Sequence, residues 1–302
     1  MNMTRRRALQ RASAGLSAIA ATQLPAFSAD ANEQSDWLKI SLQQYSFKSM
    51  LTGKQPTLKT IDYPKFAVEK CDIKALEYFN GFFEDKAGNE AYFRDLRKRC
   101  DDLGVENQLM LCRNKRALDH PSATVRAEAA KDYRPWLEAA KALGCHSIRV
   151  DVRSKGDADE VQKAAVDGLN QLCEIAKPFA VDIIIENHGN HSSNGAWVAS
   201  LMKAVDRKNL GTLPDFGNFG NYDRYLGVTE LLPWARAVCA KTHGFHQDGT
   251  EEQTDFARML KIIKKSGFAG HIGIEYEGRK HSPVEGVLLT KKLIQKTLAE
   301  IG

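Results

Sequence analysis

The chain has 302 residues, of which 43% are hydrophobic, 27% charged and 8% aromatic. These values are typical of a globular protein and exclude a collagen-like fibre, a disordered tail or a small disulfide-rich protein. The formal charge of +5 falls to +2 without the first 31 residues, which hold four arginines and one acid. That balance argues against a nucleic-acid partner, because nucleic-acid-binding proteins normally carry a strongly basic face. No apolar run reaches the ~20 residues of a transmembrane helix, so no stable membrane anchor is expected.

The N-terminal segment has the pattern of an export signal. The basic sequence Thr4–Arg7 precedes an uncharged stretch, residues 12–29, that is rich in alanine and serine. Ala29–Ala31 then offers a cleavage site. Residues 1–31 resemble a signal peptide of the twin-arginine type, which predicts a protein exported to the bacterial periplasm by that route. The alternative is a short amphipathic helix at the N-terminus.

Six cysteines follow this segment. An even number in an oxidising compartment is compatible with disulfides. None of them forms a CxxC pair, however, and most are flanked by apolar residues inside expected helices or strands. We therefore expect them to be small buried side chains rather than disulfide partners. They are Cys71, Cys100, Cys112, Cys145, Cys173 and Cys239.

Short apolar runs alternate with longer amphipathic stretches along the rest of the chain, which is typical of strands that alternate with helices. Between the apolar runs, hydrophobic residues recur at helical spacing, as in 165–176 and 256–263. The stretch Val125–Leu143 has the same pattern despite Pro135. The expected strands are Leu38–Tyr45, Ala75–Phe79, Glu106–Leu111, Ser147–Val152, Val181–Glu186, Gly211–Asp215, Ala237–Lys241 and Ile272–Tyr276.

Eight strand–helix units in ~270 residues predict an α/β protein with a (β/α)8 TIM barrel, a fold of typically ~250 residues. A doubly wound open sheet is the alternative. That fold would show a glycine-rich phosphate turn after an early strand, and the sequence has none. No linker rich in Pro, Gly or Ser follows residue 36. We therefore expect a single barrel domain over residues 37–302.

Three of the late strands end in an acidic residue, at the edge where a barrel places its active site. Glu186, Asp215 and Glu275 each finish an apolar run. An isolated carboxylate is costly to bury, and three that converge on one mouth also repel each other. A divalent cation would resolve both problems, and oxygen ligands favour Mg, Mn or a related ion. The alternative is that each acid caps a helix or pairs with a nearby lysine or arginine.

The seventh strand is ambiguous at the same edge. Its alternation places Cys239, Lys241 and His243 on one face. If Lys241 points inward, a neutral imidazole at His243 would complete a ligand set with the three acids. The alternative places His243 in a surface loop.

These residues carry a family resemblance. Glu186, Asp215 in the sequence Thr-Leu-Pro-Asp-Phe-Gly-Asn-Phe, and Glu275 in Gly-Ile-Glu-Tyr-Glu-Gly resemble the sugar phosphate isomerase/epimerase superfamily. This group consists of xylose isomerase-like TIM barrels and includes endonuclease IV. The resemblance covers nearly the whole chain after the signal segment, is strongest from Ser147 onward, and is closest to the exported branch with a twin-arginine signal.

The resemblance implies one divalent metal ion, held by a Glu, an Asp, a His and a Glu after strands five to eight. Glu186, Asp215 and Glu275 match three of these ligands. The family's strand-seven motif is usually His-x-Lys, whereas this chain has Cys239-Ala240-Lys241. The fourth ligand is therefore His243, Cys239 or a water molecule. The metal is Mn, Mg, Co or Zn.

The resemblance also implies an enzyme, a metal-dependent isomerase or epimerase that acts on a sugar or keto-sugar through an enediolate. Glu186 and Glu275 are the implied residues that take and return the proton. A lyase or dehydratase on a keto-sugar or keto-glycoside could use the same intermediate. Other inward-facing residues are candidates for substrate binding: His188, Lys241, Arg149, Glu77 and Gln44.

The substrate is expected to be a carbohydrate without a phosphate group, because the sequence has no phosphate-binding turn and phosphorylated sugars are scarce outside the cytoplasm. A homo-oligomer is compatible with the family resemblance. Two other functions remain as alternatives. One is a periplasmic sugar-binding barrel without catalysis, suggested by Cys239 in the usual place of a histidine. The other is a nuclease like endonuclease IV, which the low net charge and the export signal disfavour.

Overall fold

The computed structural model describes residues 37–302, so the predicted signal peptide, residues 1–31, lies outside the described part of the chain. The described residues belong to one compact unit, Gln34–Gly302. Their strands form a sheet in the order β6-β5-β4-β3-β2-β1-β8-β7, and every strand pair in it is parallel. The strands are β1 Leu38–Gln43, β2 Ala75–Phe79, β3 Glu106–Leu111, β4 Ser147–Val150, β5 Asp182–Glu186, β6 Leu210–Leu213, β7 Val238–Thr242 and β8 Gly270–Tyr276.

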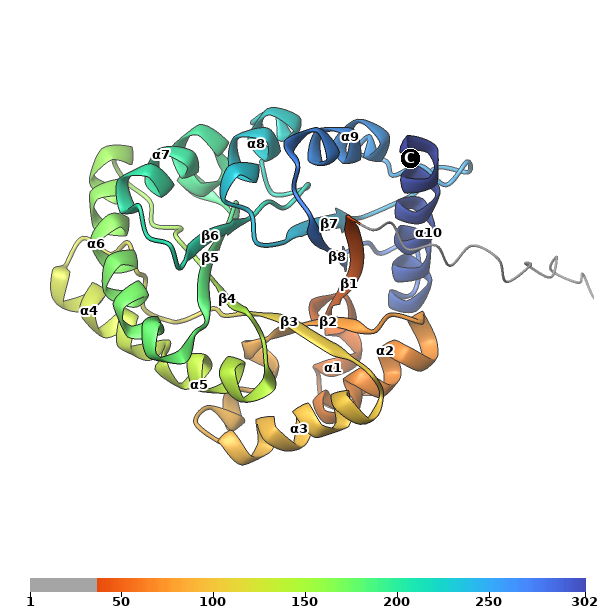
Figure 1. Cartoon of the computed structure of the whole chain (residues 1–302), viewed down its shortest axis with the longest axis horizontal. Coiled ribbons are helices and arrows are strands. Elements are labelled where there is room, and N and C mark those ends of the chain that lie inside the picture. The colour runs from red at the N-terminus through yellow and green to blue at the C-terminus, as the bar shows by residue number, and fades with distance from the viewer. Residues whose placement is uncertain (1–36) are drawn as a thin grey trace, which may run out of the picture. The chain divides into compact units, whose positions relative to one another are not determined.

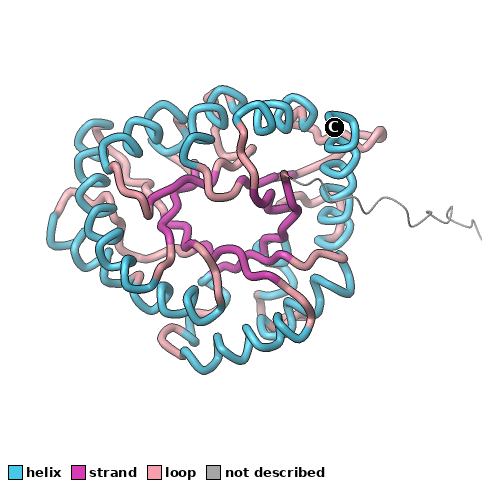
Figure 2. The backbone as a smooth tube through the Cα atoms, in the orientation of Figure 1, coloured by secondary structure: helices cyan, strands magenta, loops and turns pink. Residues whose placement is uncertain are grey.

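Helices surround the strands on the outside (Figure 1), and the strands form the inner ring of this unit (Figure 2). The ring closes between β6 and β7 through two parallel bridges, Thr212 with Ala235 and Asp215 with Cys239. This arrangement confirms the predicted TIM barrel. The helices are α1 Lys48–Leu51, α2 Tyr63–Cys71, α3 Glu90–Asp102, α4 Ala123–Asp132, α5 Arg134–Leu143, α6 Ala158–Ala176, α7 Gly195–Val205, α8 Arg224–Leu231, α9 Phe256–Ser266 and α10 Pro283–Ile301.

Two apolar layers follow from the alternation of side chains along each strand. Ile183 and Ile185 belong to the large core that packs with the helices, whereas Ile184 belongs to a small separate cluster. The other buried members of that cluster are Leu109, Leu111, Leu213, Ala237 and Cys239. One step further along the inward face come Glu186 after Ile184 and Asp215 after Leu213. The apolar interior of the barrel therefore gives way to acidic residues at its mouth.

The strand predictions hold to within two residues. Two-residue differences occur at the carboxyl ends of β1, β4 and β6, which end at Gln43, Val150 and Leu213, and at the amino end of β8, which begins at Gly270. Gln44 and Asp215 therefore lie just beyond their strands. In a barrel, side chains just past the strand ends point into the mouth, so these shifts leave both residues near the expected site.

The expected helix Val125–Leu143 is two helices, and the single-helix prediction was wrong. α4 ends at Asp132, and α5 begins at Arg134 with Pro135 in its first turn. Proline has no backbone N–H and disfavours the helical conformation of the preceding residues, so it is tolerated only where a helix begins. The apolar periodicity continues across the break because both helices pack on the same core.

A close approach at α6 gives a testable consequence. A Cβ at Gly168 would overlap the backbone carbonyl oxygen of Leu118 and lie 2.8 Å from its carbonyl carbon. Gly168→Ala should therefore lower the free energy of unfolding by about 1–3 kcal/mol, even though alanine favours helix. Urea unfolding followed by circular dichroism measures this change. The exposed Lys163→Ala on the same helix is the control and should change stability by about 0.5 kcal/mol or less.

All six cysteines are free and buried, which confirms that they are small core side chains. Burial raises the pKa of Cys71 to about 11, and it also raises that of Cys173, to about 12. Such thiols react slowly because the thiolate is the reactive form. Within residues 37–302, no helix combines the length and the apolar character that crossing a membrane requires.

Candidate active site

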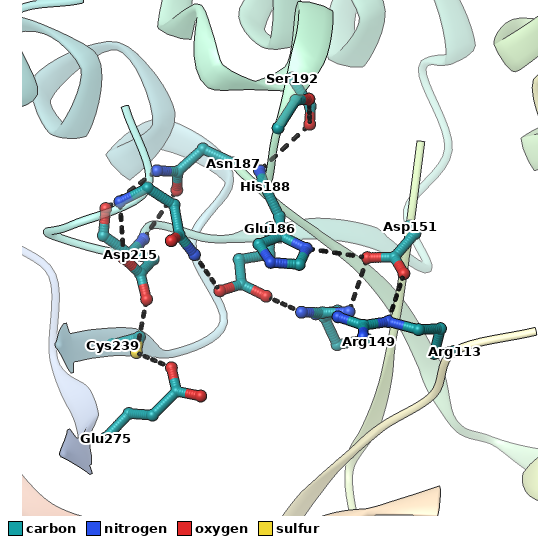
Figure 3. Close-up of polar contacts among 12 residues, drawn as sticks. Arg113, Arg149, Asp151, Glu186, Asn187, His188, Ser192, Asp215, Cys239 and Glu275 are labelled. Carbon is teal, nitrogen blue, oxygen red and sulfur yellow. Dashed lines mark hydrogen bonds and ion pairs between the residues drawn. The ribbon is translucent and has the colours of Figure 1, made fainter. Parts of the chain in front are cut away.

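Asp215, Cys239 and Glu275 come from three neighbouring positions around the mouth, after β6, on β7 and on β8 (Figure 3). All three side chains are buried, and one ligand atom of each lies within 4.8 Å of the others. The Cys239 thiol donates to Asp215 Oδ2 over 2.9 Å and to Glu275 Oε2 over 3.4 Å. Among the described residues, this is the group of acids, cysteines and histidines that is compatible with a divalent metal ion.

The loop after β6 holds Asp215 in a fixed orientation. Its Oδ1 accepts hydrogen bonds from the backbone N–H groups of Gly217, at 2.7 Å, and Asn218, at 2.9 Å. The side chain of Asn187, just after β5, binds both backbone groups of Asp215: Oδ1 accepts from its N–H, and Nδ2 donates to its carbonyl. Asn187 was not predicted as a site residue, although its position directly after Glu186 places it at the same edge. These bonds leave Oδ2 as the atom that points to Cys239.

Lys241 brings a buried positive charge to these acids. Its Nζ lies 3.1 Å from Glu275 Oε2, 3.6 Å from Asp215 Oδ2 and 2.6 Å from Glu277 Oε1. The Lys241 side chain is only 5% exposed, whereas that of Glu277 is 34% exposed. Burial disfavours the ammonium, but the adjacent carboxylates outweigh it and raise the pKa of Lys241. Lys241 therefore remains charged, and Glu277, absent from the predicted site, anchors it from the solvent side.

Glu186 lies in a different part of the mouth. Its carboxylate forms an ion pair with Arg149, and its Oε1 accepts a hydrogen bond from Asn218 Nδ2 at 3.0 Å. Arg149 also binds Asp151 Oδ1 at 2.7 Å, and both Arg149 and Glu186 are almost fully buried. Glu186 is not part of the group that contains Cys239. The structure thus separates one of the four predicted metal ligands from the others by pairing it with an arginine.

His243 is also outside the ligand group. β7 ends at Thr242, so His243 follows the strand, and its backbone N–H donates to Glu251 Oε1 at 3.1 Å. Of the two residues considered for the fourth ligand, the structure places Cys239 beside Asp215 and leaves His243 half-buried in the following loop.

The acids at the mouth differ in their protonation. Burial raises the pKa of Asp215 to about 6 and that of Glu275 to about 7, although Lys241 counteracts both shifts. Burial also raises the pKa of the Cys239 thiol, and the two carboxylates beside it add to this effect. For Glu186, burial acts in the same direction, but the charge of Arg149 outweighs it and lowers the pKa. Near neutral pH, Glu275 can therefore accept or release a proton, whereas Glu186 stays ionised.

A second cluster of charges lies beside Glu186. Asp151 Oδ1 lies 3.5 Å from His188 Nδ1, and Asp151 Oδ2 lies 3.4 Å from Arg113 Nε. Arg153 also contacts His188, at 3.1 Å. Arg113 and His188 are drawn on either side of Asp151 in Figure 3. His188 and Arg149 were predicted to bind substrate, and the structure brings both to this cluster at the mouth.

The remaining two predicted substrate contacts, Glu77 and Gln44, lie inside the barrel. Glu77 is fully buried, and its Oε1 accepts a hydrogen bond from Ser41 Oγ at 2.5 Å. Gln44 Oε1 accepts from the backbone N–H of Phe79 at 3.2 Å. Glu77 Oε2 and Gln44 Nε2 are buried without a protein partner. Burial raises the pKa of Glu77 to about 8.

This buried acid should make stability depend on pH. The pKa of Glu77 is higher in the folded protein than the ordinary 4.5, so the folded state binds its proton more tightly. Stability therefore falls as the pH rises from about 5 to 8, by an amount on the order of 3 kcal/mol. Glu77→Gln should remove this contribution, so the difference in free energy of unfolding between wild type and variant should grow across this range.

Urea unfolding at pH 5.5, 7 and 8.5 measures that difference. Asp215 and Glu275 also titrate in this range and are present in both proteins; because the charge of Glu275 helps to raise the pKa of Glu77, the comparison measures Glu77 together with this coupling. Glu69→Gln removes a carboxylate that is 56% exposed and serves as the control. A difference between wild type and E77Q that is the same at all three pH values would contradict a raised pKa for Glu77.

Comparison with other proteins identifies the family of this chain. The model of the xylose isomerase-like TIM barrel family matches residues 67–297. The chain belongs to this family. An inosose isomerase from Halalkalibacterium halodurans (strain C-125) is 26% identical over 171 residues, which cover 49% of this chain and 59% of that relative. The match thus spans less than two thirds of the relative's length.

Two further comparisons agree with this assignment. The 3'-dehydrocarminate deglycosidase alpha subunit of Microbacterium sp. is 18% identical over 293 residues, covering 70% of this chain and 81% of the relative. The crystal structure of IOLI protein with a bound zinc atom has a TM-score of 0.69 at 16% identity, covering 87% of this chain and 98% of that one. This structural similarity shows the shared fold. The family and the named relatives support the prediction of an enzyme related to the sugar isomerases.

Proposed function

We propose that this protein is an isomerase or epimerase that acts on a non-phosphorylated sugar or keto-sugar through an enediolate. The observation that carries this proposal is the pairing of Glu275, whose pKa is about 7, with the buried ammonium of Lys241 at 3.1 Å. A general base works best when its pKa lies near the working pH. The adjacent positive charge stabilises the oxyanion that forms when the substrate loses a proton.

In this reaction Glu275 removes the proton from the carbon next to the substrate carbonyl. Lys241 donates to the carbonyl oxygen as that oxygen gains negative charge. If the proton returns to the other face of the same carbon, the product is an epimer. If it goes to the neighbouring carbon, the product is an isomer. Glu186 is the second carboxylate of the mouth, but its ion pair with Arg149 makes it a weaker base than Glu275.

The other side chains of the mouth suit a polyhydroxylated substrate. Glu77 and Gln44 each have a buried polar atom without a protein partner, and such an atom can be satisfied by a substrate hydroxyl group. His188 and Arg149 provide donors on the opposite side of the mouth. The inosose isomerase among the relatives supports a keto-cyclitol or keto-sugar as substrate.

A metal ion would be held by Asp215, Cys239 and Glu275. When bound, such an ion would polarise the carbonyl and stabilise the enediolate, and a cysteine ligand favours Zn or Co over Mg or Mn. The IOLI structure with its zinc supports this possibility through the shared fold. The donor set fits only in part, however, because Lys241 already contacts the two carboxylate oxygens that face Cys239.

A lyase is the second candidate, and one relative favours it. The 3'-dehydrocarminate deglycosidase alpha subunit is named for the removal of a sugar from a dehydro compound. The same enediolate leads to elimination when the neighbouring carbon carries a leaving group. For this chain the substrate would then be a keto-glycoside, and Glu275 would act on the same proton.

We also propose that the protein is exported to the periplasm by the twin-arginine route, as the Thr4–Arg7 pattern suggests. Six free cysteines in the described residues suit a protein that folds before export. Cell fractionation of the full chain, compared with a variant in which Arg5 and Arg6 are lysines, tests this proposal. Loss of the mature protein from the periplasm in the variant is the expected result, and equal amounts would refute it.

Exchange with solvent deuterium tests the catalytic proposal. The purified protein is incubated in D2O with inosose, D-fructose and D-tagatose, and NMR follows the proton on the carbon next to the carbonyl. Deuterium uptake, together with an epimer or isomer, is the expected result. Uptake with release of an aglycone from a keto-glycoside would favour the lyase. Tight binding of a sugar with no uptake would contradict catalysis and support the sugar-binding alternative.

A further inference from the structure

We infer that Lys241 and Cys239 together take the place of the metal ion, so that the protein at rest holds Asp215 and Glu275 with its own N–H and S–H donors. This inference concerns the site of the proposed function but does not depend on the reaction assigned to it.

The hydrogen bonds around the two acids are the first observation. Asp215 Oδ2 and Glu275 Oε2 are the atoms that a metal at this position would need. Both accept from the Cys239 thiol, and both lie within ion-pair distance of Lys241 Nζ. The other oxygen of Asp215 accepts two backbone N–H groups. The two acids are thus bound by donors of the protein itself.

The buried polar atoms that lack a hydrogen-bond partner are the second observation. Within residues 37–302, seven buried side-chain nitrogen or oxygen atoms lack a hydrogen-bond partner. They belong to Gln43, Gln44, Glu77, Asn114, Arg149 and Glu186. None belongs to Asp215, Lys241 or Glu275. Asp215 and Glu275 are thus not among the unpartnered groups, whereas Glu186 Oε2, at the same mouth, faces the Arg149 guanidinium.

The distance between the Cys239 sulfur and the Asp215 oxygen is the third observation. With usual bond lengths to zinc of ~2.3 Å for sulfur and ~2.0 Å for oxygen, tetrahedral ligands are ~3.5 Å apart. The Cys239 Sγ to Asp215 Oδ2 separation is 2.9 Å. This separation corresponds to an S–Zn–O angle of about 85°, well below the tetrahedral value of ~109°. The thiol and Asp215 are therefore at hydrogen-bond separation, closer than two tetrahedral ligands of one ion, whereas the 3.4 Å between Sγ and Glu275 Oε2 is close to the spacing of such ligands.

The chemistry of the Cys239 side chain also favours direct hydrogen bonds to the acids over a shared metal ion. An imidazole at this position could either donate an N–H to the acids or turn its lone pair toward a cation shared with them. A thiol presents a proton, which the carboxylates accept directly. The fourth predicted ligand is also engaged, because Glu186 is paired with the buried Arg149. Each acid that the sequence suggested for a metal is thus held by a positive or donor group of the protein.

Cobalt binding tests this inference with three proteins: wild type, Cys239→Ala and Cys239→His. Each is dialysed against CoCl2 and then against buffer, and the retained metal is measured by mass spectrometry. The visible absorption of Co2+ and the shift in melting temperature are recorded in parallel. Wild type and C239A should retain almost no Co2+. C239H should retain about one ion per chain and bind it at least about 10-fold more tightly than wild type.

One Co2+ per wild-type chain, retained as firmly as in C239H, would overturn the inference, and a sulfur-to-cobalt absorption band would identify Cys239 as the ligand. Failure of folded C239H to retain Co2+ would also count against it. The wild-type result stands even if C239H does not fold. Because the measurement is metal content, a negative outcome here is independent of the deuterium exchange that tests the proposed reaction.

Discussion

Lys241→Met is expected to lower the free energy of unfolding by about 3–5 kcal/mol. The substitution keeps an unbranched side chain of similar length but removes the charge that lies between Asp215, Glu275 and Glu277. Two of these carboxylates are almost fully buried, so without Lys241 they must either stay charged without compensation or take up protons. Chemical unfolding at pH 7, followed by circular dichroism and tryptophan fluorescence, measures the loss.

Lys280→Met is the matched control. Lys280 pairs with Glu252 at the surface and is 65% exposed, so this change should cost less than about 1 kcal/mol. The double variant Lys241→Met with Glu275→Gln should recover part of the stability, because it removes one of the stranded charges. Equal stability of K241M and wild type would show that the acids do not depend on Lys241.

Glu275→Gln is expected to reduce deuterium exchange and turnover by about 10²–10⁴-fold. The amide keeps the size of the side chain and can still contact Lys241, but it cannot take the substrate proton. The effect should be in kcat, with KM nearly unchanged, because the lost interaction belongs to the proton-transfer step. Steady-state kinetics on whichever keto-sugar shows exchange in the wild type provides the measurement.

Glu277→Gln serves as the comparison for this experiment. Glu277 also contacts Lys241, at 2.6 Å, but it is 34% exposed and lies on the solvent side. Its substitution should reduce turnover by less than about 10-fold. If the two glutamine variants lost activity equally, Glu275 would be acting only through the charge of Lys241 and not as the base.

The barrel could be predicted because its signal is local and repeated. Each strand shows a short apolar run, and each error in its ends is one or two residues. The break at Tyr133 between α4 and α5 was missed because apolar spacing says nothing about backbone hydrogen bonds, whereas Pro135 removes one. The sequence does contain this signal, because Pro135 can only stand in the first turn of a helix.

The site was predicted less completely, because contacts between strands are not visible in a single strand. The acids at the ends of β5, β6 and β8 were expected to share one mouth; Asp215 and Glu275 lie together there, whereas Glu186 pairs with Arg149. The pairing of Glu186 with Arg149 depends on which neighbours β4 and β5 present to each other. Likewise, the alternation along one strand could not show whether Cys239 or His243 lies beside the acids. That choice depends on where β7 ends, at Thr242.

The closure of the barrel has a consequence for its motions. β6 and β7 are joined only by isolated bridges, and one of these joins Asp215 to Cys239, whose thiol donates to Asp215 Oδ2. Several other seams carry continuous ladders, such as the five-residue register between β7 and β8. Fluctuations of the ring should therefore concentrate at this seam. Amide hydrogen exchange should be faster at Cys239 and Phe216 than in the β4–β5 ladder. Local opening of the barrel would then occur at the reaction centre.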